Sequence, residues 1–314
     1  MQKRIYALFF ILVLNVLNSI AWADPWFTGP LLAPAGKTVP LGHFNFEMYV
    51  FDTKLVGEYD ATGKKIAIPH FQSTQYNPLL TYGLADNFDV EFSVPYTMNK
   101  SRGQKAHHIG DTTVILGFQA YRQKPTSWIP NLRMVIAEVI PTGRYDNLNP
   151  TDLGTGVTGA GCYQTIFGLR FQDLTQITET HYLRTRLALS YVYADPSNTT
   201  GKTGFGGILS PRGHIRPGNT MAVDLASEFT VTQNWVAVME VYHLYHQPAQ
   251  FNGQDQFLRR LLVNHPAFFT TSIAPAIEYN FSQHFGIIGG AWLSVKGKNS
   301  PVFTSAVIAF NTYW

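Results

Sequence analysis

The segment Phe88–Met98, FDVEFSVPYTM, alternates apolar and polar residues more regularly than the rest of the chain. Successive side chains of an extended strand point to opposite faces, so a period of two divides the segment into two surfaces. One surface is apolar and aromatic, and the other carries Asp89, Glu91, Ser93 and Thr97. Such a strand suits a wall with lipid on one side and a polar lumen on the other.

Similar alternation recurs along the chain and predicts about twelve strands, with ten or fourteen as open alternatives. The face that points inward is least clear in 132–140 and 157–171. The other predicted strands are 44–51, 74–82, 112–121, 132–140, 157–171, 181–193, 220–231, 235–245, 267–281, 285–295 and 301–314.

The connections between these segments alternate in length, as expected for a barrel with long outer loops and short periplasmic turns. Residues 122–131 and 172–180 are longer than an inner turn needs. The fold class is therefore all-β, an antiparallel up-and-down transmembrane β-barrel. The predicted outer connections are 52–70, 99–110, 141–156, 194–219 and 247–266, and the tight turns are 83–87, 232–234 and 282–284.

The N-terminus has the layout of a cleaved signal peptide. Lys3 and Arg4 precede an uncharged stretch over 5–20, and Ala21-Trp22-Ala23 supplies a cleavage site after Ala23. Polar residues interrupt the apolar stretch, which disfavours an uncleaved transmembrane helix. The predicted organisation is a signal peptide over 1–23, a periplasmic arm or plug over 24–42, and a transmembrane barrel over 43–314.

The composition also favours a membrane barrel. Charged residues make up 14% of the chain, against about a quarter in soluble domains. Loss of Lys3 and Arg4 lowers the formal net charge from +3 to +1, so no nucleic-acid partner is expected. The lone Cys162 cannot form an internal disulfide. After the signal, no apolar run approaches the roughly 18 residues of a spanning helix, so we expect strands to cross the outer-membrane lipid.

Aromatic residues flank the predicted turns, at the level where amphipathic rings favour the lipid headgroups. The alternative is ordinary cross-strand pairing in a soluble hairpin. The chain ends in an alternating strand with a terminal aromatic, which we expect the barrel-assembly machinery to bind by strand addition. The candidate girdle residues are Tyr82, Phe88, Tyr96, Trp235, Phe281, Phe285, Phe310 and Trp314.

Nine charged residues inside the predicted strands alternate with apolar or small residues. A cation that faces mid-membrane lipid costs roughly 2–4 kcal/mol, so we expect these side chains to face the lumen. They could pair across a filled barrel, or they could line a path for permeation; both roles remain open. The lumen candidates are Glu47, Asp89, Glu91, Arg184, Arg186, Asp224, Glu228, Glu240 and Glu278.

Motifs for chemistry are weak. Gly201-Lys202-Thr203 lacks the preceding glycine of a phosphate-binding loop. His243 and His246 fall on opposite faces of a strand, which disfavours shared metal ligation. The oxygen-rich stretch 146–152 lacks the glycine of a calcium-binding loop, and turn chemistry explains it better. We expect no catalytic residues, no metal site and no cofactor.

Several glycine-centred motifs follow one another in a familiar order. The first is Tyr82-Gly-Leu-Ala-Asp-Asn-Phe-Asp-Val90, which continues to Tyr96. The others are Ile109-Gly-Asp-Thr-Thr-Val-Ile-Leu-Gly-Phe118, Ile140-Pro-Thr-Gly143 and Leu153-Gly-Thr-Gly156. In this order the chain resembles the outer-membrane transporters named for the meta-pathway of phenol degradation (the MetA-pathway family). The resemblance implies a barrel that passes small, often aromatic or hydrophobic compounds, and it implies no catalytic residues.

The sequence thus predicts a channel or transporter for a small-molecule solute in the bacterial outer membrane. Two alternatives remain: a barrel enzyme of the lipid hydrolase type, and a structural or adhesive barrel that acts through its outer loops. A Ser-His-acid cluster at one rim would favour the enzyme. A filled lumen without a path would favour the adhesive barrel.

Overall fold

The computed structural model describes residues 25–124, 127–204, 212–254, 257 and 259–314. The predicted signal peptide therefore lies outside the described residues. The strands that form the wall of the molecule are β1 (Phe44–Tyr59), β3 (Phe71–Ala85), β4 (Phe88–Ser93), β5 (Tyr96–Ser101), β6 (Gln104–Ile109), β7 (Thr112–Tyr121), β8 (Asn131–Ile140), β9 (Gln164–Gln176), β10 (Tyr182–Ala194), β13 (Thr220–Thr230), β14 (Trp235–His246), β17 (Phe268–Ser282), β18 (Phe285–Lys298) and β19 (Ser300–Tyr313).

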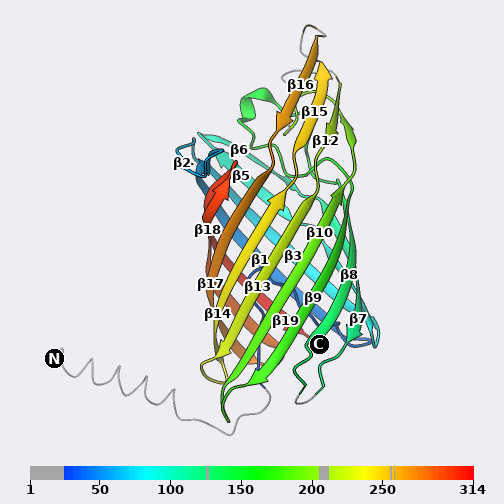
Figure 1. The fold of residues 1–314 in the computed structure, drawn as a ribbon, viewed down its shortest axis with the longest axis vertical. Coiled ribbons are helices and arrows are strands. Elements are labelled where there is room, and N and C mark those ends of the chain that lie inside the picture. Colours follow the sequence, from blue (N-terminus) through cyan, green and yellow to red (C-terminus); the bar gives the residue numbers. More distant parts are fainter. Residues whose placement is uncertain (1–24, 125–126, 205–211, 255–256, 258) are drawn as a thin grey trace, which may run out of the picture.

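These strands close into an antiparallel barrel (Figure 1). Each strand pairs with its neighbour in sequence, and β19 returns to pair with β1 from Asn45↔Tyr313 to Tyr59↔Ser300. In the described residues β4 with β5, and β6 with β7, each form one continuous wall strand, which gives twelve. The predicted twelve-stranded up-and-down barrel is confirmed. Closure gives each of the twelve wall strands a partner on both sides, as a structure in lipid requires. Among the described wall strands, only the outer segment β6 pairs on one side, with β5.

The segment 88–98 is interrupted at Val94 and Pro95, where the prediction had one strand. Proline has no N–H to donate to the ladder, so the strand breaks there. Both parts still pair with β3, β4 at Leu79–Ala85 and β5 at Phe71–Tyr76. The alternation survives the break, because Phe88 and Met98 are exposed while Glu91 and Thr97 are buried.

Several predicted boundaries are wrong on the outer side. β1 continues to Tyr59, so residues 52–59 of the predicted outer connection 52–70 are strand. Residues 99–110 were expected to form a loop, but β5 and β6 form a hairpin around Arg102 and Gly103, both with positive φ. Paired strands simply continue beyond the membrane there. The strand predicted at 157–171 begins only at Gln164. Residues before it belong to a long outer loop. Its Gly143 and Ala160 backbone N–H groups donate hydrogen bonds to Asp111, which lies between β6 and β7.

That outer loop, residues 141–163, contains the short 3-10 helix η1 (Pro150–Asp152) and folds over the mouth of the barrel. The Asn99 side chain, which faces the lumen from β5, donates to the carbonyls of Thr155 and Val157, both at 2.9 Å. Because these contacts lie on the inner face of the wall, the loop narrows the lumen from the outer side.

A second, four-stranded sheet rises above the wall made by β13, β14 and β17 (Figure 1). The sequence pattern missed it, since 194–219 and 247–266 were predicted only as outer connections. Among the described residues, no helix is both long enough and apolar enough to span a membrane. Beyond the barrel, the short strands are β2 (Lys65–Ile66), β11 (Ser197–Thr199), β12 (Gly213–Arg216), β15 (Ala249–Gln254) and β16 (Arg260–His265).

Candidate functional site

The N-terminal arm, residues 25–42, runs inside the barrel. It enters at the periplasmic end beside β17, where the Asn280 side chain donates to the carbonyl of Trp26. It rises to the middle of β14 at 31–33, crosses to β7 and β9 at Gly36, and descends to β3, where the Gly42 N–H donates to the carbonyl of Gly83. The arm therefore crosses the whole lumen and fills its periplasmic half.

Carboxylates of the wall hold the arm by its backbone. Glu240 accepts hydrogen bonds from the N–H groups of Leu31 (2.6 Å), Leu32 (3.0 Å) and Ala33 (2.8 Å). Glu278 accepts from Thr28 at 2.8 Å, and Asp89 accepts from Val39 at 2.9 Å. A segment without secondary structure needs partners for its buried N–H groups, and these charge-assisted bonds supply them.

Close packing also fixes the lower end of the arm. Gly83 lies on β3 directly against the carbonyl of Pro40, and a Cβ at this position would overlap that oxygen. A glycine is therefore required where the arm backbone reaches the wall. This contact explains the single glycine in the Tyr82–Tyr96 motif as a packing position.

One ion-pair cluster lies on the inner wall between β4, β8 and β9. Arg133 contacts both Asp89 (2.6 Å) and Glu91, and Arg170 reaches Glu91 at 3.0 Å. Arg133 is 1% exposed. Gly117 on β7 leaves the space that the Arg133–Asp89 pair occupies, since a Cβ there would overlap both side chains. Each buried charge is thus compensated by an opposite one.

A second cluster centres on Glu228. Arg184 donates through Nε at 2.6 Å and through its terminal nitrogen, and Arg186 Nε lies 3.2 Å from the same carboxylate. Arg186 also donates to the carbonyl of Ala33, and the Arg184 guanidinium lies 4.1 Å from the ring centroid of Phe27. This cluster therefore links β10 and β13 to the arm.

Beside the arm, the lumen contains a cavity of about 410 Å³. Leu31 to Ala35 of the arm form one wall. Glu47, Tyr49, Phe51 and Thr53 of β1 line it with Ser73, Gln75, Asn77 and Leu79 of β3, and Arg186, Tyr242 and Trp292 complete it. β3 therefore contributes a ladder of mostly uncharged polar side chains, and β1, β14 and β18 contribute aromatic rings.

The aromatic side of the cavity is itself ordered. Trp292 makes edge-on ring contacts with Tyr242 (6.2 Å between centroids) and Phe51 (6.3 Å). Its indole N–H donates to the Ser272 hydroxyl at 2.8 Å, which fixes the ring plane. Glu47 accepts from Asn311 at 2.9 Å and from the Tyr49 hydroxyl at 3.2 Å. The polar groups of the lining thus point in defined directions.

The nine lumen candidates all lie on the inner side of the wall in the structure, but in different environments. Glu47 and Arg186 line the cavity, Glu240 and Glu278 hold the arm, and Asp224 is buried at 4% exposure near Glu240. The others divide between the two ion-pair clusters, namely Asp89, Glu91, Arg184 and Glu228.

The girdle candidates lie on the outer surface, and seven of them are near the periplasmic end. Ring contacts link several into a belt, including Phe44–Tyr82 (4.5 Å), Phe44–Trp314 (5.7 Å), Phe88–Phe118 (4.9 Å), Trp235–Tyr279 (4.7 Å), Phe281–Phe285 (5.3 Å) and Phe285–Phe310 (6.5 Å). Tyr96 lies eight residues along the wall strand from Phe88, about 26 Å away, toward the outer end.

Three of the histidines lie at separate places in the structure. His243 is exposed and contacts Thr271 through Nδ1, whereas the His246 ring contacts Thr220. His214 contacts Asn198 in the small sheet. These three imidazoles are therefore each engaged with a threonine or an asparagine, at different sites.

Sequence reasoning missed Arg133, Arg170 and Trp292. Arg133 and Arg170 lie in the two segments whose inward face was least clear from the pattern. A signal was present in the sequence. In an alternating strand Arg133 lies on the face opposite Leu132, and Arg170 on the face opposite Leu169, so both arginines could have been assigned to the lumen. Trp292 lies between glycines and small residues in β18, and its inward orientation follows only from the register with β19.

No family model matches the sequence, and no curated protein matches it. Solved structures do match. An outer membrane channel from Pseudomonas putida F1 aligns with a TM-score of 0.69 at 13% identity, covering 90% of this chain and 100% of that chain. The Pseudomonas putida toluene transporter TodX gives 0.44 at 11%, covering 94% and 100%. The CymD monoaromatic hydrocarbon channel gives 0.40 at 9%, covering 88% and 89%. The first likeness shows that this chain shares the fold of that outer-membrane β-barrel.

Proposed function

We propose that this protein is a channel of the bacterial outer membrane for small hydrophobic or aromatic compounds. The observation that carries the proposal is the 410 Å³ cavity between the arm and the aromatic side of the wall. Cavities of about 300–1,000 Å³ suit small-molecule ligands. A closed barrel with an apolar outside and a cavity inside has the features of a membrane channel.

The size and lining of the cavity indicate the solute. An apolar cavity of about 150 Å³ binds benzene, so the larger cavity here accommodates a single substituted ring. Contacts between aromatic rings contribute about 0.5–1.5 kcal/mol beyond burial, and Trp292, Tyr242 and Phe51 offer such contacts. The hydroxyl and amide groups on β1 and β3 accommodate a polar substituent on the same ring.

We further propose that the chain is related to the transporters named for the meta-pathway of phenol degradation. The support is the order of the glycine-centred motifs, which occupy defined places in the fold. Residues 140–143 lie at the start of the outer loop, and residues 153–156 form a turn within it. Asp111, in the motif at 109–118, accepts a hydrogen bond from the Gly143 N–H of that loop.

Uptake by proteoliposomes tests the proposal. Purified protein should admit toluene and benzyl alcohol faster than protein-free liposomes, and Trp292→Ala should change the relative rates of aromatic and aliphatic solutes of equal size. Trp128→Ala is the matched control, because Trp128 is 88% exposed and does not line the cavity. Equal rates with and without the wild-type protein would refute the channel. An unchanged ratio in Trp292→Ala would refute the role of the aromatic lining.

A further inference from the structure

Three lysines lie in one row on the outer surface of the barrel, where β1, β3, β5 and β6 run side by side (Figure 1). Cross-strand pairing joins Lys54 to Gln72, Gln72 to Lys100, and Lys100 to Lys105. Residues directly opposite each other in paired strands point to the same face. Asn99, next to Lys100, faces the lumen, so this lysine row faces outward. All three lysines are exposed.

The lysine row lies at the level expected for the headgroups of the outer leaflet. Lys54 follows Phe44, which belongs to the aromatic belt at the periplasmic end, by ten positions along β1. Ten extended residues cover about 33 Å. The tilt of about 35–45° that is typical of barrel strands reduces this to about 25 Å along the axis, which is the usual height of the apolar band in such barrels.

An apolar surface lies below the lysine row, toward the middle of the membrane. Across the same four strands, the row four positions nearer the periplasmic end consists of Val50, Tyr76, Tyr96 and Ile109. The row between the two consists of Asp52, Thr74, Met98 and His107. Tyr76, Tyr96 and Ile109 are between 36% and 48% exposed. Acyl chains below a headgroup on the lysines would therefore meet exposed apolar side chains.

Carboxylates of the described residues do not neutralise the lysine row. Asp52 is the single acid in these three rows, and its Oδ1 accepts hydrogen bonds from the Gln72 amide (2.8 Å) and the Thr74 hydroxyl (2.9 Å). Neither Asp52 nor Glu58, the next acid along β1, forms an ion pair with a described lysine. Like charges directly opposite each other destabilise a sheet, so an anion between Lys100 and Lys105 would relieve their repulsion.

A hollow of about 330 Å³ at these lysines has room for such an anion. Lysine ammonium groups bind phosphate as point charges, and clusters of cations at a membrane surface attract anionic lipids. The lysine row extends across three strand spacings, about 14 Å, which suits a headgroup with more than one phosphate. The lining of the hollow includes Gln72, Thr74, Met98, Lys100, Lys105 and His107.

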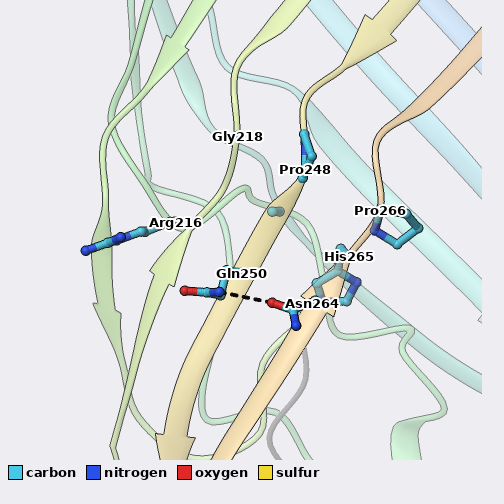
Figure 2. Close-up of a pocket in the computed structure, with 8 residues that line it drawn as sticks. Arg216, Gly218, Pro248, Gln250, Asn264, His265 and Pro266 are labelled. Carbon is cyan, nitrogen blue, oxygen red and sulfur yellow. Dashed lines mark hydrogen bonds between the residues drawn. The ribbon is translucent and has the colours of Figure 1, made fainter.

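The hollow of about 550 Å³ at the base of the small outer sheet is different. Gln250 and Asn264 are joined there by a hydrogen bond of 3.0 Å, and Figure 2 shows the Arg216 side chain pointing away from this pair. That hollow therefore has no guanidinium group beside its amide donors, whereas Lys100 and Lys105 point from neighbouring strands into one hollow.

We propose that the lysine row binds the phosphates of lipopolysaccharide in the outer leaflet, with the acyl chains of the lipid against the apolar row below. Free phosphate shares the headgroup chemistry but lacks acyl chains, so it gains nothing from Tyr76, Tyr96 and Ile109. Bound lipid would also hold the β5–β6 hairpin in place. The inner face of that hairpin supports the outer loop through the hydrogen bonds of Asn99.

Native mass spectrometry of the folded barrel in detergent tests this site, with rough lipopolysaccharide as the probe. Wild-type protein should retain the lipid, and the double variant Lys100→Gln/Lys105→Gln should retain at least five-fold less at the same lipid concentration. Lys54→Gln, which leaves the β5–β6 hairpin unchanged, should also lower the retention. Lys64→Gln is the matched control, because Lys64 is exposed between β1 and β2, outside the three rows. Heat-modifiable migration on gels checks that each variant is folded.

Four outcomes would overturn the proposal. Equal retention by the wild type and the double variant would exclude the lysine row as the phosphate site. An equal loss in Lys64→Gln would show only a general effect of surface charge. Displacement of the lipid by inorganic pyrophosphate at equal phosphate concentration would assign the site to free phosphate. Equal retention of phosphatidylglycerol or of dephosphorylated lipopolysaccharide by the wild type would exclude selection of the lipopolysaccharide phosphates.

Discussion

At the scale of single residues, four of the buried glutamates of the lumen fall into two groups. Glu91 and Glu228 face guanidinium groups of the wall, whereas Glu240 and Glu278 face backbone N–H groups of the arm. Removing a charge from water is costly unless opposite charges or hydrogen bonds replace the solvent. The first group therefore stabilises the wall, and the second group positions the arm.

Arg133 allows a direct test of the first group. Arg133→Gln leaves Asp89 and Glu91 without their shared cation in a buried position, and loss of one partner of a buried pair costs about 3–5 kcal/mol. We expect a decrease of that size in the free energy of unfolding, measured by urea titration in detergent. Arg260→Gln, at an exposed position, should change it by less than about 0.5 kcal/mol. A small effect of Arg133→Gln would show that Arg170 and Val39 alone compensate the two acids.

Cys162 allows a test of the outer loop. The side chain is buried at 3% exposure, and burial raises the pKa of its thiol to about 11. Because only the thiolate reacts, the rate of maleimide labelling at pH 7.5 should be low and should rise about ten-fold per pH unit up to that pKa. A cysteine at the exposed outer turn, introduced by Lys64→Cys, should react fast. Rapid labelling of native Cys162 at pH 7.5 would contradict the closed packing of residues 141–163.

At the scale of elements, the arm is the part that decides whether the lumen is open. It has no strand partners, and its position depends on side chains of the wall, chiefly Glu240. Glu240→Ala removes the acceptor of three N–H groups, so we expect the arm to loosen and the conductance in planar bilayers to increase. Glu58→Ala, at an exposed position of β1, should leave the conductance unchanged. A conductance unchanged in both variants would place the constriction elsewhere, in the outer loop.

The closing strand β19 is the second decisive element. Trp314 and Phe44 exchange two backbone hydrogen bonds, at 2.8 and 3.0 Å, and their rings stack. We propose that the assembly machinery binds this strand before it pairs with β1. Deletion of Tyr313 and Trp314 should therefore reduce the fraction of heat-modifiable protein in the outer membrane, measured on unboiled gels. Normal assembly of the truncated chain would exclude a role for the terminal aromatic.

At the scale of the whole molecule, cooperative closure governs stability. Every wall strand has two partners, and β1 joins the last strand of the chain along fourteen residue pairs. Partial unfolding would expose unpaired backbone groups to lipid, at several kcal/mol each. We expect the unboiled protein in dodecyl sulfate to migrate differently from the boiled protein. Identical migration of both samples would be incompatible with a closed barrel.

The sequence by itself determined the class of the fold and most of the wall. Alternation of the kind seen at Phe88–Met98 identifies a two-faced strand, and the short turns between such strands allow only neighbours in sequence to pair. Boundaries were wrong where strands continue outside the membrane, because the outer part of a hairpin, such as 99–108 in β5–β6, lacks the apolar face that marks a wall strand. The small sheet was missed for the same reason, since its strands are short and mostly polar.

Only the tertiary structure decided what fills the lumen. Residues 25–42 carry no periodic pattern, since the arm forms no strand and its N–H groups pair with side chains more than 200 positions away, such as Glu240 and Glu278. The cavity beside it likewise combines the arm with β1, β3, β14 and β18. A local pattern reports which face of a strand is apolar, because that depends on neighbours in sequence. It does not report which inner faces meet across the barrel, because that depends on closure and on the path of the arm.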